Sequence, residues 1–203
     1  MLARDTAVEL GHPAMASAAF LIWVDDPAMV KDGRISLLGP DFSSCRGKSV
    51  PFGKVVIAGV KGFNEENSYN RYREMEALRY GIDLKGYMMK AASQYQREWS
   101  RVSHEALDRG FSSGILGGAL LERFKALEFV ETCEVFFVTS SGEDVRELKN
   151  ISNAVIQIVG AMNKMLEELS FDCDDCEYVD VCSDVFELKK MKMSAERKMK
   201  NNV

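Results

Sequence analysis

Short apolar runs recur along the first two thirds of the chain, and glycine, proline or aspartate ends the first two of them. They predict β-strands at residues 19–24, 34–38, 54–60 and 135–139. The run Lys54–Val60 is the clearest because β-branched residues dominate it, and its continuous apolarity predicts a central strand buried on both faces. Residues 43–53 carry serine, glycine, lysine and proline instead, and are expected to form a surface loop that holds Cys45.

Other stretches place apolar residues at helical spacing. They predict helices over residues 65–80, 105–108, 114–127 and 144–169. Ser103 and the pair Ser112-Ser113 stand where N-caps are expected. The glycines between 114 and 118 resemble a phosphate-binding loop only loosely, since no lysine follows them, and close helix packing explains them better. Residues 98–102 alternate like a half-buried strand, whereas residues 87–96 fit either a short helix or the approach to that strand.

Strands and helices therefore intermix, which predicts an α/β (α+β) fold with a mixed β-sheet flanked by helices. The longest predicted helix shows a sustained apolar face, made of Leu148, Ile151, Val155, Ile158, Met162, Met165 and Leu169. We expect one domain over residues 1–170 and a cysteine-bearing extension over 171–203 that ends in a short amphipathic helix. The basic residues after 188 fit a solvated helix end, or alternatively a site for an acidic partner.

Composition narrows the classes of function. A net charge of -5 gives no general case for nucleic acid binding. The apolar run at 18–24 is too short to span a membrane and lies too late for a typical signal peptide. The expected compartment is the cytoplasm, where thiols stay reduced and clustered cysteines hold metal more often than they form disulfides. The sequence does not indicate an oligomeric state.

Three of the five cysteines are clustered near the C-terminus. Cys173, Cys176 and Cys182 form a C-x2-C-x5-C pattern, and thiolates at such spacing can converge on one metal or cluster. The predicted cofactor is an iron–sulfur cluster, with zinc as the alternative. A fourth ligand would be Cys133, a histidine, an acid or a partner subunit, or the position would stay open. The plain alternative is three surface thiols on a loop.

Three stretches in order carry a resemblance to a known family. The first is Ile35-Ser36-Leu37-Leu38-Gly39-Pro40-Asp41-Phe42 with the following strand, the second is Glu98-Trp99-Ser100-Arg101-Val102-Ser103, and the third runs from residue 116 to 139. Together they resemble the middle domain of acetyl-CoA synthase. This is the nickel subunit of the carbon monoxide dehydrogenase/acetyl-CoA synthase complex, or the β subunit of archaeal acetyl-CoA decarbonylase/synthase. The resemblance covers roughly residues 30–150.

The resemblance implies a role in coenzyme A binding. A tryptophan at the position of Trp99, with arginines nearby, is expected to help bind coenzyme A, which points to Trp99, Arg97 and Arg101 here. Adenine can stack on an indole, and a guanidinium can pair with phosphate. Arg71, Arg73 and Arg79 would add positive charge. The alternative is that Trp99 belongs to the core and the arginines are solvated.

The cysteine cluster fits the same family only in part. Cys173 and Cys176 match the start of its cluster-binding pattern, C-x2-C-x8-C, whereas Cys182 comes three residues early. No cysteine follows Cys182, so this sequence holds no candidates for the family's later nickel ligands. We therefore expect an accessory or binding component in anaerobic one-carbon and acetyl-CoA metabolism, with coenzyme A, a corrinoid protein, a methyltransferase, carbon monoxide dehydrogenase subunits or an iron–sulfur centre as ligand or partner. The alternatives are a small iron–sulfur or zinc protein and a non-catalytic interaction domain.

Overall fold

The computed structural model describes residues 7–45, 49–80, 84, 89–91, 99–167, 181–182 and 185. The chain divides into two compact units, residues 1–149 and 150–203. The domain boundary expected at 170/171, and most of the predicted amphipathic helix near the C-terminus, lie outside the described residues. None of the described helices combines the length and apolar character that crossing a membrane requires.

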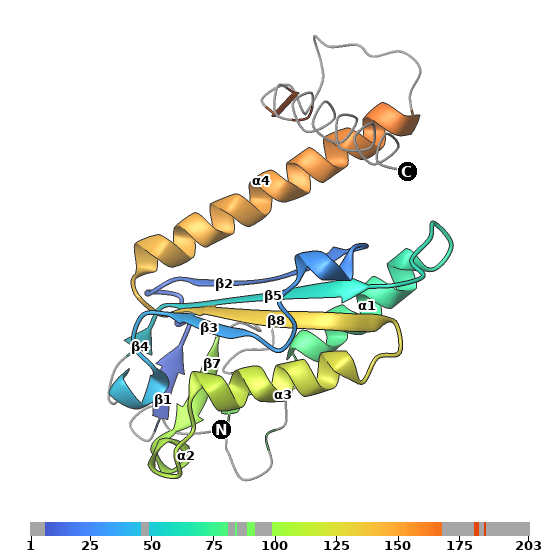
Figure 1. Cartoon of the computed structure of the whole chain (residues 1–203). Helices are drawn as coiled ribbons and strands as arrows, with labels where there is room; N and C mark the ends of the chain where they lie inside the picture. Colours follow the sequence, from blue (N-terminus) through green and yellow to red (C-terminus); the bar gives the residue numbers. More distant parts are fainter. Residues whose placement is uncertain are drawn as a thin grey trace. The chain divides into compact units, whose positions relative to one another are not determined.

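The described strands of the first unit form two four-stranded sheets (Figure 1). One sheet has the order β4 (Ser49–Val50), β1 (Ala7–Leu10), β7 (Ser100–Ser103), β6 (Met89–Ala91). The other has the order β2 (Ser17–Val24), β5 (Phe52–Val60), β8 (Val130–Val138), β3 (Ile35–Leu38). Each sheet contains parallel and antiparallel pairs. The mixed α+β class predicted from the sequence is therefore confirmed, with the strands divided between two sheets.

Strand β5 takes the central position that its apolar run predicts. It pairs in parallel with β2 and antiparallel with β8, and its residues are buried on both faces. Phe52, Val56 and Ala58 point into the larger core, whereas Val55 lies on the opposite face and is 6% exposed. A strand hydrogen-bonded on both edges and covered on both faces is mostly apolar, and Lys54, which is 7% exposed, is the charged exception in β5.

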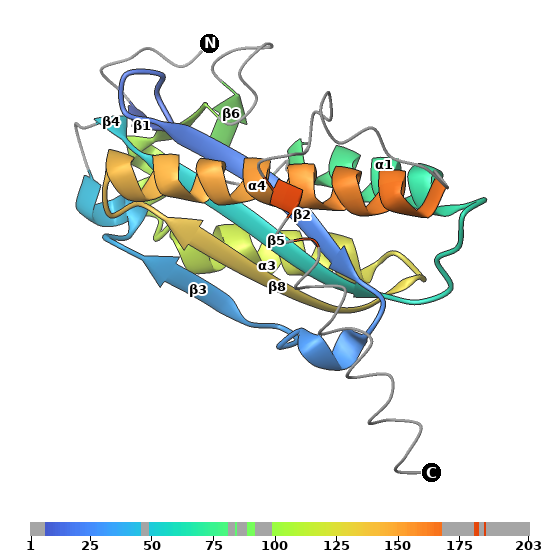
Figure 2. The same ribbon diagram turned by 90° about the horizontal axis from the view of Figure 1, so that it is seen from above.

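The helices of the first unit pack on these sheets, and each follows from a local sequence signal. Their bounds are α1 Ser68–Tyr80, α2 His104–Asp108 and α3 Ser113–Lys125, with α4 Gly142–Glu167 crossing into the second unit. Helix α3 runs along one face of the β5–β8 sheet (Figures 1 and 2). Its predicted apolar stripe is confirmed: Leu116, Leu120 and Phe124 are fully buried, and Leu121 is 8% exposed.

Polar side chains fix where α2 and α3 begin. The Ser103 hydroxyl accepts the N–H of Ala106, and the Ser112 hydroxyl accepts the N–H of Ile115, as the sequence predicts. Asp41 adds a long-range cap, because its carboxylate accepts both the backbone N–H and the hydroxyl of Ser113, at 3.0 and 2.8 Å. A carboxylate there also complements the positive end of the α3 dipole.

The prediction that residues 43–53 form a surface loop is wrong in its main feature. Residues Phe42–Cys45 form a 3-10 helix, and Cys45 is only 4% exposed. Residues 49–50 are strand β4, and Phe52 starts β5. The polar composition misled the prediction because the buried residues are isolated between polar ones, so no periodic pattern marks them. Residues 46–48 of this segment lie outside the described part.

Helix α4 contributes its first turns to the first unit. Val145 is fully buried and Leu148 packs with it against Ala18 and Val138, which covers the second face of the β5–β8 sheet. The apolar face predicted further along is present but not buried, since Ile151 and Val155 are 50% and 41% exposed. Helix α1 departs similarly from its predicted stripe: Met75 is fully buried but Tyr69 is 66% exposed.

Candidate functional site

Trp99 directly precedes β7, and its indole contacts the guanidinium of Arg101 and the imidazole of His12. The guanidinium carbon of Arg101 sits 5.5 Å from the centroid of the indole. The imidazole of His12 meets the indole edge-on, with ring centroids 4.9 Å apart and an interplanar angle of 82°. Cation–π and edge-to-face contacts of this kind favour one orientation of the tryptophan ring.

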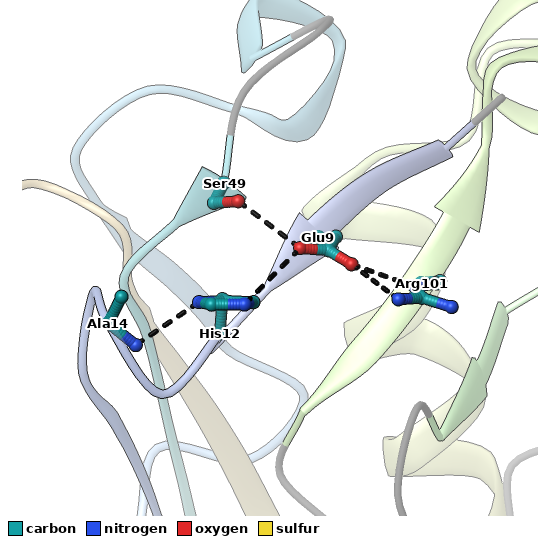
Figure 3. A network of polar contacts seen from close by, with 5 residues as sticks. All are labelled: Glu9, His12, Ala14, Ser49 and Arg101. Atoms are coloured by element: carbon teal, nitrogen blue, oxygen red, sulfur yellow. Dashed lines mark hydrogen bonds and ion pairs between the residues drawn. The ribbon is translucent and has the colours of Figure 1, made fainter. Parts of the chain in front are cut away.

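Arg101 is held in place by a buried carboxylate. Glu9 on β1 lies opposite Arg101 on β7 in the antiparallel register, and opposite Ser49 on β4 in the parallel one. Its Oε1 accepts from Nε and Nη2 of Arg101, at 2.8 and 2.7 Å, and its Oε2 accepts from the Ser49 hydroxyl at 3.3 Å (Figure 3). Glu9 is 3% exposed, so the ion pair is needed to compensate a buried charge.

His12 connects this ion pair with the tryptophan. The residue follows Gly11, whose φ of 68° turns the chain away from β1. Nδ1 of His12 accepts the N–H of Ala14 at 3.1 Å, which leaves Nε2 to carry the proton of the neutral ring (Figure 3). That Nε2 lies 3.8 Å from Oε2 of Glu9. We call Glu9, His12, Ser49, Trp99 and Arg101 the Trp99 cluster.

The Trp99 cluster contains a buried hydrogen-bond donor, the indole Nε1 of Trp99, that has no partner among the described residues. The indole Nε1 of Trp99 is shielded from solvent and forms no hydrogen bond with any described residue, although the side chain as a whole keeps some exposure. Buried polar atoms are normally paired, so an unsatisfied donor beside a fixed aromatic ring is unusual. Nε2 of His104, at the start of α2, is in the same condition.

The other cations proposed for this site are only partly placed. Arg97 lies outside the described residues. Arg71 donates to the carbonyls of Lys61 and Gly62, at 3.1 and 2.6 Å, so it anchors the start of α1 to the turn after β5. Arg73 contacts Tyr69 of its own helix. The side chain of Arg79 is not among those described.

The predicted metal ligands Cys173 and Cys176 lie outside the described residues, and Cys182 is half-buried. The described part contains no group of three or more histidine, cysteine or acidic side chains that could hold a metal ion. Cys133, the candidate fourth ligand, is fully buried on β8 within the larger core. Burial, and then the nearby Asp32 carboxylate, raise the pKa of its thiol to about 12. We therefore assign Cys133 to the hydrophobic core of the first unit.

Alkylation tests this assignment of Cys133. We expect iodoacetamide at pH 8 to modify Cys133 at least about 100-fold more slowly in the folded protein than in urea, because the thiolate is the nucleophile and is scarce when the pKa is near 12. Unfolding removes the burial that raises this pKa. Peptide mass spectrometry after short labelling pulses measures the modification, with half-buried Cys182 as the internal comparison. Equal rates in native and unfolded protein would refute the assignment.

Sequence reasoning missed Glu9, His12 and Ser49. Glu9 stands in a strand of only four residues, Ala7-Val8-Glu9-Leu10, where no alternation distinguishes a buried strand. Its partners are 40 and 92 residues away along the chain. The available signal was a lone acid within an apolar run, which predicts a paired buried charge once a strand is assumed.

Comparisons with known proteins agree with the resemblance. The chain is 33% identical over 135 residues to the acetyl-CoA decarbonylase/synthase complex subunit beta of Methanothermobacter thermautotrophicus. That match covers 65% of this chain and 28% of the relative, so the chain corresponds to little more than a quarter of the relative's length. Residues 2–145 match the family described as CO dehydrogenase/acetyl-CoA synthase complex beta subunit, and this range contains the whole Trp99 cluster. The chain therefore belongs to the family of CO dehydrogenase/acetyl-CoA synthase complex beta subunits.

Proposed function

We propose that this domain binds coenzyme A at the Trp99 cluster, as an accessory or binding component of acetyl-CoA metabolism. The observation that carries the proposal is the fixed indole of Trp99, which is held by Arg101 and His12, while its Nε1 has no hydrogen-bond partner among the described residues. Adenine has the flat π-face that stacks on such a ring. Family membership supplies the metabolic setting.

The cations that would bind the phosphates of coenzyme A are proposed from the sequence. Arg97, two residues before Trp99, is the first candidate, and Arg101 was grouped with it for the same role. The relative is named as a subunit of a complex, so we also propose corrinoid protein, methyltransferase or carbon monoxide dehydrogenase subunits as partners. We propose that the domain carries out this function in the cytoplasm of an anaerobic cell.

Removal of the indole tests the proposal. We expect Trp99→Leu to weaken coenzyme A binding about 10-fold, because base–aromatic stacking contributes about 1–3 kcal/mol. Isothermal titration calorimetry at fixed salt measures the change. Trp23→Phe is the matched control, since Trp23 packs against Phe63 away from the Trp99 cluster, and its affinity should stay within about 2-fold of wild type.

Two outcomes would contradict coenzyme A binding at Trp99. If the wild-type protein gives no binding heat at coenzyme A concentrations up to millimolar, coenzyme A is not its ligand. If Trp99→Leu binds coenzyme A with unchanged affinity, Trp99 is not part of the binding site. That second result is what a non-catalytic interaction domain with Trp99 in its core predicts. Thermal melts of both variants establish that the comparison is made between folded proteins.

The cysteine cluster stays a separate proposal from the sequence, with an iron–sulfur cluster preferred to zinc. Iron, sulfide and zinc analysis of protein prepared without oxygen distinguishes the two metals. We expect Cys176→Ser to abolish metal binding, because the two remaining thiolates, of Cys173 and Cys182, are too few to hold the metal. Cys45→Ser is the control, since Cys45 is buried in the first unit and should leave the metal content unchanged. Metal content unaffected by Cys176→Ser would refute the site.

A further inference from the structure

Arg101 already has a strong partner for its charge. Two of its N–H groups bind a single carboxylate oxygen of Glu9, and the side chains of Arg101 and Glu9 are 17% and 3% exposed. A phosphate approaching this guanidinium would also approach the Glu9 carboxylate, whose repulsion offsets much of the attraction. Transferring Arg101 to a phosphate would leave Glu9 buried without its partner, which is strongly unfavourable.

The same ion pair fixes the plane that supports Trp99. The guanidinium faces the indole at 5.5 Å, so Glu9 determines where one face of the ring rests. The Ser49 hydroxyl donates to the second carboxylate oxygen of Glu9, Nε2 of His12 lies 3.8 Å from that oxygen, and the His12 ring meets the indole edge-on. A ring held on one face and one edge before binding loses little further freedom when a ligand binds.

We infer that Glu9 and Arg101 are positioning residues that hold the indole of Trp99 ready for stacking, and that Arg101 does not bind the phosphates of the ligand. The inference rests on the proposed binding of coenzyme A by Trp99 for its functional meaning. It revises the role expected for Arg101 and adds Glu9, which the sequence did not single out. Phosphate recognition then falls to other cations, Arg97 first among them.

The two possible roles of Arg101 predict opposite changes in coenzyme A affinity for one substitution, Glu9→Gln. If Arg101 positions Trp99, Glu9→Gln weakens coenzyme A binding about 3- to 10-fold, because the guanidinium loses its anchor. If Arg101 binds phosphate, Glu9→Gln removes the competing carboxylate and strengthens binding. Glu105→Gln is the matched control: it removes the same charge from an exposed pair with Arg109, and should change affinity less than 2-fold.

A double-mutant cycle separates positioning from general loss of structure. In a Trp99→Leu background, Glu9→Gln should have almost no further effect on coenzyme A affinity, because it acts through the ring that is gone. An equal loss in both backgrounds contradicts positioning. Arg101→Lys gives a second variant that keeps the charge: positioning predicts weaker binding, since an ammonium cannot form the planar fork, whereas near wild-type affinity would favour a phosphate contact.

Acrylamide quenching gives a readout that needs no ligand. In a Trp23→Phe protein, Trp99 is the sole tryptophan. Glu9→Gln should raise its quenching constant at least about 2-fold, and Glu105→Gln should leave it unchanged. Unchanged quenching in Glu9→Gln overturns the inference whether or not coenzyme A binds. Increased quenching in a protein that shows no coenzyme A binding keeps the positioning role and refutes the proposed ligand instead.

Discussion

Phe42→Ala is expected to lower the free energy of unfolding by about 3–5 kcal/mol, the largest effect that we predict for a single residue. Phe42 is fully buried where the segment after β3 enters the core. Its ring stacks on Phe111 with centroids 5.8 Å apart, and it meets Phe52 and Phe137 edge-on at 5.9 and 6.3 Å. Truncation would remove three aromatic contacts and leave a cavity that rigid neighbouring rings cannot fill.

Urea unfolding followed by circular dichroism measures this effect. The matched control is Leu38→Ala, four residues earlier, because Leu38 is 59% exposed and should change stability by no more than about 0.5 kcal/mol. Phe42→Leu should fall between the two, since it keeps part of the buried volume. A loss below about 1 kcal/mol for Phe42→Ala would contradict the placement of this segment in the core.

Gly117→Ala and Gly118→Ala should have opposite effects on stability although the two glycines are neighbours in α3. A methyl group on Gly117 would lie 2.7, 2.9 and 3.0 Å from three carbons of Ile35, a β-branched side chain that cannot readily move aside. The same group on Gly118 would have nothing within 4 Å. Replacing glycine by alanine inside a helix otherwise stabilises it by up to about 1 kcal/mol.

We expect Gly117→Ala to lose about 1–2 kcal/mol, because overpacking of about 1–3 kcal/mol exceeds the gain in helix propensity. Gly118→Ala should gain up to about 1 kcal/mol. Paired thermal or urea melts measure the difference, and each variant serves as the control for the other. Equal effects of the same sign would contradict the close approach of α3 to β3, as well as the packing role that the sequence assigned to these glycines.

Much of the fold follows from local patterns. The central position of β5 followed from its unbroken apolar run, and both Ser103 and Ser112 cap the helices that the sequence assigned to them. These features depend on residues close together in the chain, so periodicity and capping residues in the sequence are enough to predict them. The division of the strands into two sheets could not be predicted, because β1 and β4 are too short to show a pattern.

The candidate site was only half accessible to sequence reasoning. Trp99 and its neighbour Arg101 both came from the resemblance. Glu9 and Ser49 join them through cross-strand register, which depends on strand order and therefore on the whole fold. Burial of a carboxylate such as Glu9 is explained by its partner, and a partner 92 residues away leaves no local trace.

The cysteines show the opposite limitation. Spacing alone suggested a metal site at Cys173, Cys176 and Cys182, but it could not say which remaining cysteine would complete it. In the structure Cys133 is fully buried in the core of the first unit, where burial raises the pKa of its thiol to about 12. Side-chain burial is a property of the folded chain, so the count and spacing of cysteines cannot supply it.

Fluorescence titration of Trp99 with coenzyme A tests the central claim most directly. In Trp23→Phe protein the emission reports Trp99 alone. Coenzyme A should quench this emission saturably, with the dissociation constant that calorimetry gives for the same protein, because the adenine stacks on the indole. Emission that stays constant while calorimetry records binding would place coenzyme A elsewhere, and the absence of both signals would contradict coenzyme A as the ligand of this domain.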